Sequence, residues 1–135
     1  MPFVIDASVA ACWILADESH PVADAALARL DDDAIVAPSL WWFETRNLVS
    51  VNERRGRLDA TTSAEARRLL ANYPVAFDTE IDEEALMRLA RRRRLTVYDA
   101  AYLELALRKE IPLATLDRAL AEAARAEGAA LIESA

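Results

Sequence analysis

The chain has 135 residues, of which 54% are hydrophobic, and its formal net charge is −7 at pH 7. This length suits a single domain over residues 1–135 with a buried core, and the apolar fraction excludes a disordered chain. No apolar run approaches the roughly 20 residues that a membrane span requires, so we expect a soluble, cytoplasmic protein. The excess of acidic residues argues against a nucleic-acid partner unless the basic residues gather on one surface.

Short apolar runs alternate along the chain with stretches that have helical periodicity. Strands are expected at 3–6, 34–37, 74–77, 111–116 and 130–132. Helices are expected at about 7–16, 21–30, 38–56, 61–73, 79–94, 98–109 and 118–128. Ser19 is the expected N-cap of the second helix. This alternation predicts an α/β fold with a parallel sheet and right-handed crossovers.

Two acidic residues stand directly after buried strands. Asp6 follows Phe3-Val4-Ile5, and Asp117 follows the strand at 111–116. Open α/β sheets bind their ligands at the carboxyl ends of their strands. Each acid also precedes a helix, so a plain N-cap role is an equally good interpretation of either one alone.

Two further acids lie where a helix should be apolar. Glu44 interrupts a stripe formed by Leu40, Leu48 and Val51 and joined by Trp41 and Asn47, and Asp99 heads the inner stripe of the helix at 98–109. A buried carboxylate without a partner is costly, so either acid sits at the rim of the core or a cation compensates it.

Together the four acids predict a metal site. Carboxylates crowded together repel one another unless a cation neutralises them, and Mg²⁺ or Mn²⁺ suits oxygen ligands. Ser8 and Thr115, each two residues from a strand-end Asp, can orient a carboxylate or a metal-bound water. A metal site without a Cys, His or Ser nucleophile suits the hydrolysis of phosphodiesters.

Other polar residues receive simpler interpretations. Cys12 is expected to be an inert core thiol, and His20 a turn residue without a catalytic role. Glu104 and Arg108 mark the expected solvent face of the helix at 98–109.

Arginines form clusters despite the acidic balance. They are Arg54, Arg55 and Arg57, and the run Arg91, Arg92, Arg93 and Arg94. Such clusters are either solvated helix faces or surfaces that hold an RNA backbone near the acids.

Four motifs in order resemble those of the PIN-domain ribonucleases, and in particular the VapC-type toxins of toxin–antitoxin pairs. The motifs are Val4 to Val9, Pro38 to Glu44 with Asn47 and Leu48, Tyr98 to Ala106, and Pro112 to Asp117 with Leu120. The resemblance covers essentially the whole chain and implies a PIN-like three-layer α/β/α fold with a short, mostly parallel five-stranded sheet.

The resemblance also implies a function. Asp6, Glu44, Asp99 and Asp117 would form an acidic tetrad that binds Mg²⁺ or Mn²⁺, supported by Ser8, Thr115 and Asn47. The protein would be an endoribonuclease, usually a homodimer, inhibited by a cognate VapB-type antitoxin that lies over the active site. Trp41 and Trp42 either line the antitoxin groove or pack against the sheet, and packing is favoured for at least one of them.

Two alternatives remain open at this point. A catalytically idle PIN-like binding module would act only through its partner, although all four acids are intact. The other alternative is a phosphate-handling domain. A phosphatase of this kind would need an Asp where Ser8 stands. A receiver domain would need a Lys late in the chain, whereas Lys109 precedes the fourth strand.

Overall fold

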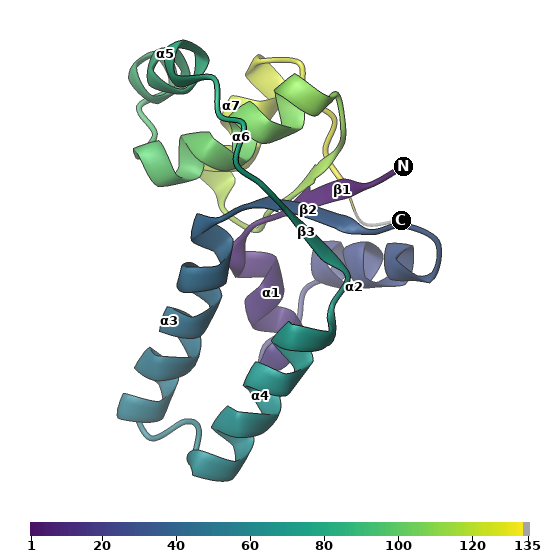
Figure 1. Ribbon diagram of the computed structural model, residues 1–135, viewed down its shortest axis with the longest axis vertical. Helices are drawn as coiled ribbons and strands as arrows, with labels where there is room; N and C mark the ends of the chain where they lie inside the picture. The colour runs from purple at the N-terminus through teal and green to yellow at the C-terminus, as the bar shows by residue number, and fades with distance from the viewer. Residues whose placement is uncertain (134–135) are drawn as a thin grey trace.

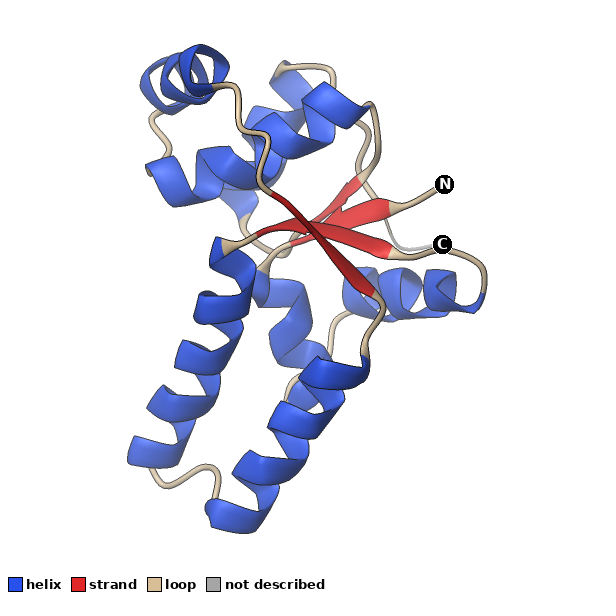
Figure 2. Cartoon of the chain, in the orientation of Figure 1, coloured by secondary structure: helices blue, strands red, loops and turns tan. Residues whose placement is uncertain are grey.

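The computed structural model describes residues 1–133, in which a parallel sheet lies between two layers of helices (Figures 1 and 2). The strands are β1 (Phe3–Ile5), β2 (Ile35–Pro38), β3 (Val75–Asp78) and β4 (Leu113–Ala114). The helices are α1 (Ala7–Ile14), α2 (Pro21–Ala28), the short 3₁₀ helix η1 (Arg29–Asp31), α3 (Leu40–Arg54), α4 (Ala60–Asn72), α5 (Glu83–Arg93), α6 (Val97–Lys109) and α7 (Arg118–Ala126). Figure 1 shows α5, α6 and α7 on one face of the sheet and α1 to α4 on the other, so the predicted three-layer α/β/α class is confirmed.

The sheet has the order β3-β2-β1-β4, and all its strands are parallel. β1 is central and fully buried, as its unbroken apolar run predicts. Ile5 pairs with Ala114 across β1 and β4. The residues that follow, Asp6 and Thr115, therefore leave the sheet side by side at its carboxyl edge.

The predicted fifth strand at 130–132 is reduced to a single bridge. Leu131 pairs with Leu113 in parallel, with hydrogen bonds from the Leu113 N–H to the Ala130 carbonyl (3.0 Å) and from the Ile132 N–H to the Leu113 carbonyl (2.9 Å). β4 itself is only two residues long, Leu113 and Ala114. The ladder beside it is therefore too short for another strand.

The buried face of α3 differs from the predicted stripe. Leu40, Glu44 and Leu48 are only partly buried and lie at the boundary of the core. The fully buried residues are Trp41, Thr45, Val49 and Asn52. Apolar residues occur on both stripes, so periodicity alone could not choose between two faces one residue apart. Trp41 packs in the core, as expected for at least one of the two tryptophans.

The α6 helix is buried almost all round, which corrects the expected exposure of Glu104. This side chain is only 3% exposed and receives a 2.6 Å hydrogen bond from Arg108 Nε. The helix lies against β1, β2 and β4 while α5 and α7 pack on it, so little of its surface reaches solvent. No helix within residues 1–133 is long and apolar enough to cross a bilayer.

Two helix starts also differ from expectation. His20, not Ser19, caps α2, and its Nδ1 accepts a 3.1 Å hydrogen bond from the Val22 N–H. Pro21 is the first helical residue, which places the cap at the residue immediately before it. Asp59 caps α4 through a capping box, ahead of the hydroxyl residues expected there.

Candidate active site

Asp6 is buried at the carboxyl end of β1 and is also the N-cap of α1. Its Oδ1 accepts hydrogen bonds from the Val9 N–H (3.2 Å) and from Ser8 Oγ (2.6 Å), and its Oδ2 accepts one from the Thr115 hydroxyl. Burial raises the pKa of Asp6 above its ordinary value, and these hydrogen bonds oppose the rise. Asp6 therefore does cap α1, but capping alone does not explain why its carboxyl group is buried.

Ser8 and Thr115 also hold the loop after β4. The Leu116 N–H donates to Ser8 Oγ at 2.9 Å, and the Asp117 N–H donates to Thr115 Oγ1 at 3.0 Å. Asp117 in turn caps α7, with its Oδ1 accepting from the Leu120 N–H at 3.0 Å. The two hydroxyls thus fix the chain segments that carry Asp6 and Asp117 relative to each other.

Glu44 reaches the same region from α3, which lies on the face of the sheet opposite α6 and α7. Its Oε1 accepts a hydrogen bond from the hydroxyl of Tyr102, a buried residue of α6. The pKa of Glu44 is raised by burial and by the negative charges of Asp99 and Asp6, while the hydrogen bond from Tyr102 lowers it. Glu44 is therefore a half-buried acid surrounded by other acids.

Asp99 completes the group from the first turn of α6. Its backbone N–H donates at 3.0 Å to Thr96 Oγ1, the N-cap of that helix. Burial and the charge of Asp117 raise the pKa of Asp99. The charges of Asp6 and Asp99 thus act on Glu44, and the charge of Asp117 acts on Asp99.

None of these acids is neutralised within the fold. No salt bridge in residues 1–133 joins any of the four to a Lys, an Arg or the N-terminus. In the same residues, no three acidic, His or Cys side chains stand close enough to enclose a metal ion directly. Mg²⁺ typically keeps several waters and takes only one or two carboxylates. The oxygen donors here suit such a partly hydrated ion rather than one in a closed protein cage.

The supporting residues divide into two groups. Ser8 and Thr115 bond Asp6 as described above, whereas Asn47 is exposed and makes no hydrogen bond to the acids among residues 1–133. Tyr102, which bonds Glu44, was not among the site residues predicted from the sequence. The available signal was a tyrosine on a buried stripe, because its hydroxyl requires a partner there.

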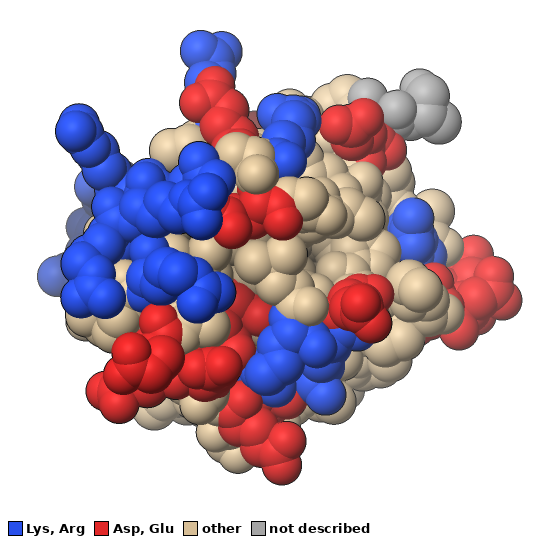
Figure 3. Space-filling view, turned by 90° about the horizontal axis from the view of Figure 1, so that it is seen from above, with Lys and Arg blue, Asp and Glu red and all other residues tan. Residues whose placement is uncertain are grey.

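The arginine clusters are partly committed to other contacts. Arg93 Nε lies 2.6 Å from Glu127 Oε2, and Arg92 Nε lies 3.7 Å from the same oxygen. Arg54 and Arg55 are exposed at the end of α3, and Arg91 and Arg94 are exposed around the end of α5. Figure 3 shows basic side chains gathered on one side of the face seen from above, next to acidic ones. Their role in RNA binding stays a prediction.

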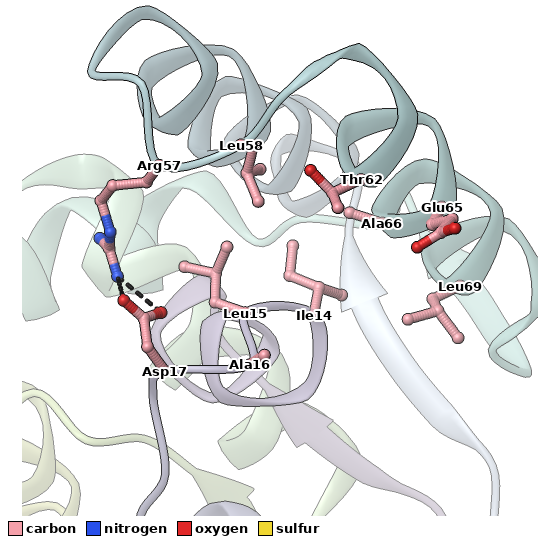
Figure 4. A pocket seen from close by; sticks show the side chains of 10 residues that line it. All are labelled: Ile14, Leu15, Ala16, Asp17, Arg57, Leu58, Thr62, Glu65, Ala66 and Leu69. Atoms are coloured by element: carbon pink, nitrogen blue, oxygen red, sulfur yellow. Dashed lines mark hydrogen bonds and ion pairs between the residues drawn. The ribbon is translucent and has the colours of Figure 1, made fainter.

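A cavity of about 390 Å³ lies away from the acids, between the end of α1 and the start of α4 (Figure 4). It is lined mainly by apolar side chains, among them Ile14, Leu58 and Leu69. At its rim Arg57 Nη2 pairs with Asp17 at 2.8 Å and with Glu18 at 3.3 Å. Arg57 therefore forms an exposed ion pair with acids of the rim.

Comparisons with known proteins agree with this geometry. The family model of the PIN domain matches residues 3–126. Exonuclease VapC9 from Pyrobaculum aerophilum is 34% identical over 93 residues, which cover 68% of this chain and 67% of that protein. The crystal structure of PAE2754 from the same organism superposes with a TM-score of 0.71 and 28% identity, covering 98% of this chain and 92% of that one. FitAcB from Neisseria gonorrhoeae shares the fold, with a TM-score of 0.61, 15% identity and coverage of 97% and 96%. The chain belongs to the PIN-domain family and is a PIN protein of the VapC type.

Proposed function

We propose that this protein is an endoribonuclease that depends on Mg²⁺ or Mn²⁺ and cleaves cellular RNA at its four acids. The observation that carries the proposal is a group of acids at the carboxyl edge of a parallel sheet, of which Asp6, Glu44 and Asp99 are at least partly buried, and for which residues 1–133 supply no salt bridge. Buried acids are normally paired, so partly buried acids with raised pKa values and no basic partner are candidates for a functional site. The name of the relative VapC9 as an exonuclease adds support for nuclease chemistry.

The roles of the residues follow from their contacts. Asp6, Glu44, Asp99 and Asp117 would hold the divalent ion, in part through its waters. When bound, the ion supplies an activated water and neutralises charge on the phosphate. Ser8 and Thr115 orient the Asp6 carboxylate by bonding both of its oxygens.

The same electrostatics sets the order of binding. Four carboxylates repel a polyanion such as RNA, so we expect RNA to approach the acids closely only after a cation has reduced their charge. Arg54, Arg55 and the Arg91 to Arg94 run would then contact phosphates farther along the strand.

Partners are proposed on the same basis. We expect a cognate VapB-type antitoxin to inhibit the enzyme by covering the acids, and two copies of the chain to form a homodimer in the cytoplasm.

A catalytically idle binding module is disfavoured because no acid is replaced. A phosphatase or a receiver domain is disfavoured because the family match spans residues 3–126.

The decisive experiment compares cleavage of a circular and a linear single-stranded RNA by the purified protein. An endonuclease cleaves both, whereas an exonuclease leaves the circle intact. EDTA should stop cleavage, and added Mg²⁺ or Mn²⁺ should restore it. Asp99→Asn should lower the rate by at least about a thousandfold, the order of magnitude lost when a principal catalytic group is removed.

Asp24→Asn is the matched control for that variant, because Asp24 is an exposed acid on α2 with no ion pair among the described residues. It should cleave at the wild-type rate. Cleavage that resists EDTA, or full activity of both Asp99→Asn and Asp6→Ala, would refute the proposal. Titration calorimetry gives a readout that does not depend on activity. The wild type should bind Mg²⁺, and Asp99→Asn should not.

A further inference from the structure

The connection between α5 and α6 contains a residue with a left-handed backbone. Arg94 ends α5 with φ 54° and ψ 41°, and its N–H donates to the Ala90 carbonyl. Glycine is the usual residue at such a helix end, because a side chain there strains the backbone. The chain itself has glycines with positive φ after α3 and α7, at Gly56 and Gly128. An arginine at position 94 therefore costs stability, and its side chain calls for another explanation.

Arg94 lines a hollow of about 360 Å³ between the end of α5 and α7. Arg92 and Arg93 line the same hollow from α5. The residues that α7 contributes are Ala119, Glu122, Ala123 and Ala126. Figure 3 looks onto this helical layer from above and shows basic side chains gathered in one group. Three positive charges and one negative charge thus line the hollow, which suits an anionic ligand.

The three arginines differ in their partners. Arg93 Nε lies 2.6 Å from Glu127 Oε2, and Arg92 Nε lies 3.7 Å from the same oxygen. Arg94 is exposed and forms no salt bridge within residues 1–133. Its charge is therefore available to an anion, whereas Arg92 and Arg93 share theirs with Glu127.

The hollow lies along a helix that starts at one of the four acids. Asp117 is the N-cap of α7, and Ala119, two residues later, lines the hollow. A helix rises about 1.5 Å per residue, so the lined stretch of α7 begins roughly 3 Å from Asp117 along the axis and ends roughly 14 Å from it. A strand with one phosphate at the acids would place its next phosphates within this range.

We infer that this hollow is a subsite for backbone phosphates of the RNA, and that Arg94 is its principal residue. The inference rests on the proposed ribonuclease function and extends it in two ways. It singles out Arg94 from the arginine run, and it makes Glu127 an internal competitor of the phosphate for Arg92 and Arg93. A phosphate accepts paired hydrogen bonds from a guanidinium as a carboxylate does, so it can replace Glu127 there.

The test measures RNA binding by fluorescence anisotropy in EDTA, where metal-dependent cleavage does not interfere, at several salt concentrations. Arg94→Gly should weaken binding of a short single-stranded RNA about fivefold. It should also reduce the dependence of log affinity on log salt by about 0.7, the value for one phosphate contact of a single strand. An abasic strand of equal length should lose affinity to the same extent, because the contact is to phosphate. Arg94→Lys keeps the charge and should retain most of the affinity.

The same variant has a second readout, because glycine relieves the left-handed backbone. Arg94→Gly should raise the melting temperature by about 3 °C while it weakens RNA binding. Glu110→Gly is the matched control. Glu110 ends α6, at the opposite end from Asp99, with φ 54° and ψ 46°, and it lines a hollow that contains no basic residue. This control should gain similar thermal stability without any loss of RNA affinity.

Glu127→Gln tests the role of the competing carboxylate. The uncharged amide no longer holds Arg92 and Arg93 by charge. RNA should therefore bind about fivefold more tightly, and its affinity should depend more steeply on salt.

Unchanged affinity and salt dependence in Arg94→Gly would overturn the inference, and so would a loss confined to the strand that carries bases. Displacement of the RNA by millimolar inorganic phosphate at constant ionic strength would assign the hollow to free phosphate instead. The expected effects in a protein that never cleaves RNA would refute the proposed function but leave the subsite intact. Cleavage by the wild type with no effect of Arg94→Gly on binding would do the reverse.

Discussion

Two groups of buried carboxylates in this small protein have opposite environments, and α6 contributes to both. On one side Asp99 and Tyr102 join Asp6 and Glu44, and none of these acids has a salt bridge within residues 1–133. On the other side Glu104 belongs to an ion-pair network that includes Arg108 and Asp78. Basic residues of the fold neutralise the acids of the second group, whereas the acids of the first group have no such partner within residues 1–133.

The ion-pair network is internally balanced. Arg108 lies 2.6 Å from Glu104 and 2.8 Å from Asp78, and Lys109 lies 3.4 Å from Asp78. The Asp82 N–H, at the start of α5, donates to Glu104 at 3.3 Å. Two positive charges thus meet two negative ones, and Arg108 holds the pKa of Asp78 below its ordinary value.

The acidic site has hydrogen-bond donors but no basic partner within residues 1–133. The pKa values of Asp6, Glu44 and Asp99 are all raised, mainly by burial. A buried charge that the fold leaves unpaired lowers stability, so its presence points to a ligand that compensates it. The network therefore holds the structure together, and the acidic site is where function is expected.

The largest effect on stability is expected in the network. Arg108→Met leaves Glu104 and Asp78 without their main partner and should lower the free energy of unfolding by about 3 kcal/mol. Denaturant unfolding measures this loss. Arg67→Met, at an exposed arginine of α4 without an ion pair in residues 1–133, should change stability by less than about 0.5 kcal/mol. Equal losses in both variants would mean that the network is only a surface feature.

In the acidic site, Tyr102→Phe should weaken Mn²⁺ binding by about tenfold while the fold persists. The phenylalanine fills the same space but no longer orients Glu44 through the hydroxyl. Titration calorimetry of wild type, Tyr102→Phe, Glu44→Gln and the double variant forms a complete cycle. If Tyr102 acts through Glu44, its substitution has no further effect in the Glu44→Gln background. Additive losses would contradict this positioning role.

Asp99→Asn should make the metal-free protein more stable at pH 7, by roughly 1 kcal/mol. The charge of Asp99 is less favourable in the folded than in the unfolded chain, because burial and Asp117 both oppose it. Thermal unfolding in EDTA measures the gain. The same substitution should remove the stabilisation that Mg²⁺ gives the wild type. A loss of stability in EDTA would show that Asp99 is structural.

The smallest effects concern pH, and the two groups should respond in opposite directions. The folded-state pKa of Asp99 is raised above 3.8. The stability that its protonation provides is therefore present at low pH and is lost as the pH rises through this raised folded-state pKa. The folded-state pKa of Asp78 is lowered, so its contribution is present above 3.8 and lost as the pH falls through the lower value. The gain from Asp99→Asn should thus shrink toward pH 4, while the loss from Asp78→Asn should persist there. Unfolding curves measured across this pH range test both predictions. If the stability changes of the two variants followed the same trend with pH, the two groups of acids would not differ.

Local sequence predicted the order and type of the elements because apolar periodicity and caps act within a few residues. It also placed Asp6 and Asp117 at the carboxyl ends of strands, where a parallel sheet brings its ligand groups together. Glu44 and Asp99 were added to the same site because each stands on an apolar helical stripe, and the resemblance to the PIN family then implied the same four acids.

The tertiary structure alone decided which faces and partners these elements have. Asp6 meets Thr115 across a separation of 109 residues, and Arg108 meets Asp78 across 30. Such contacts depend on how distant segments pack, and no local pattern contains them. For the same reason, α3 buries Thr45 and Val49 rather than Leu48, and Glu104 is a buried partner instead of a solvent-facing acid.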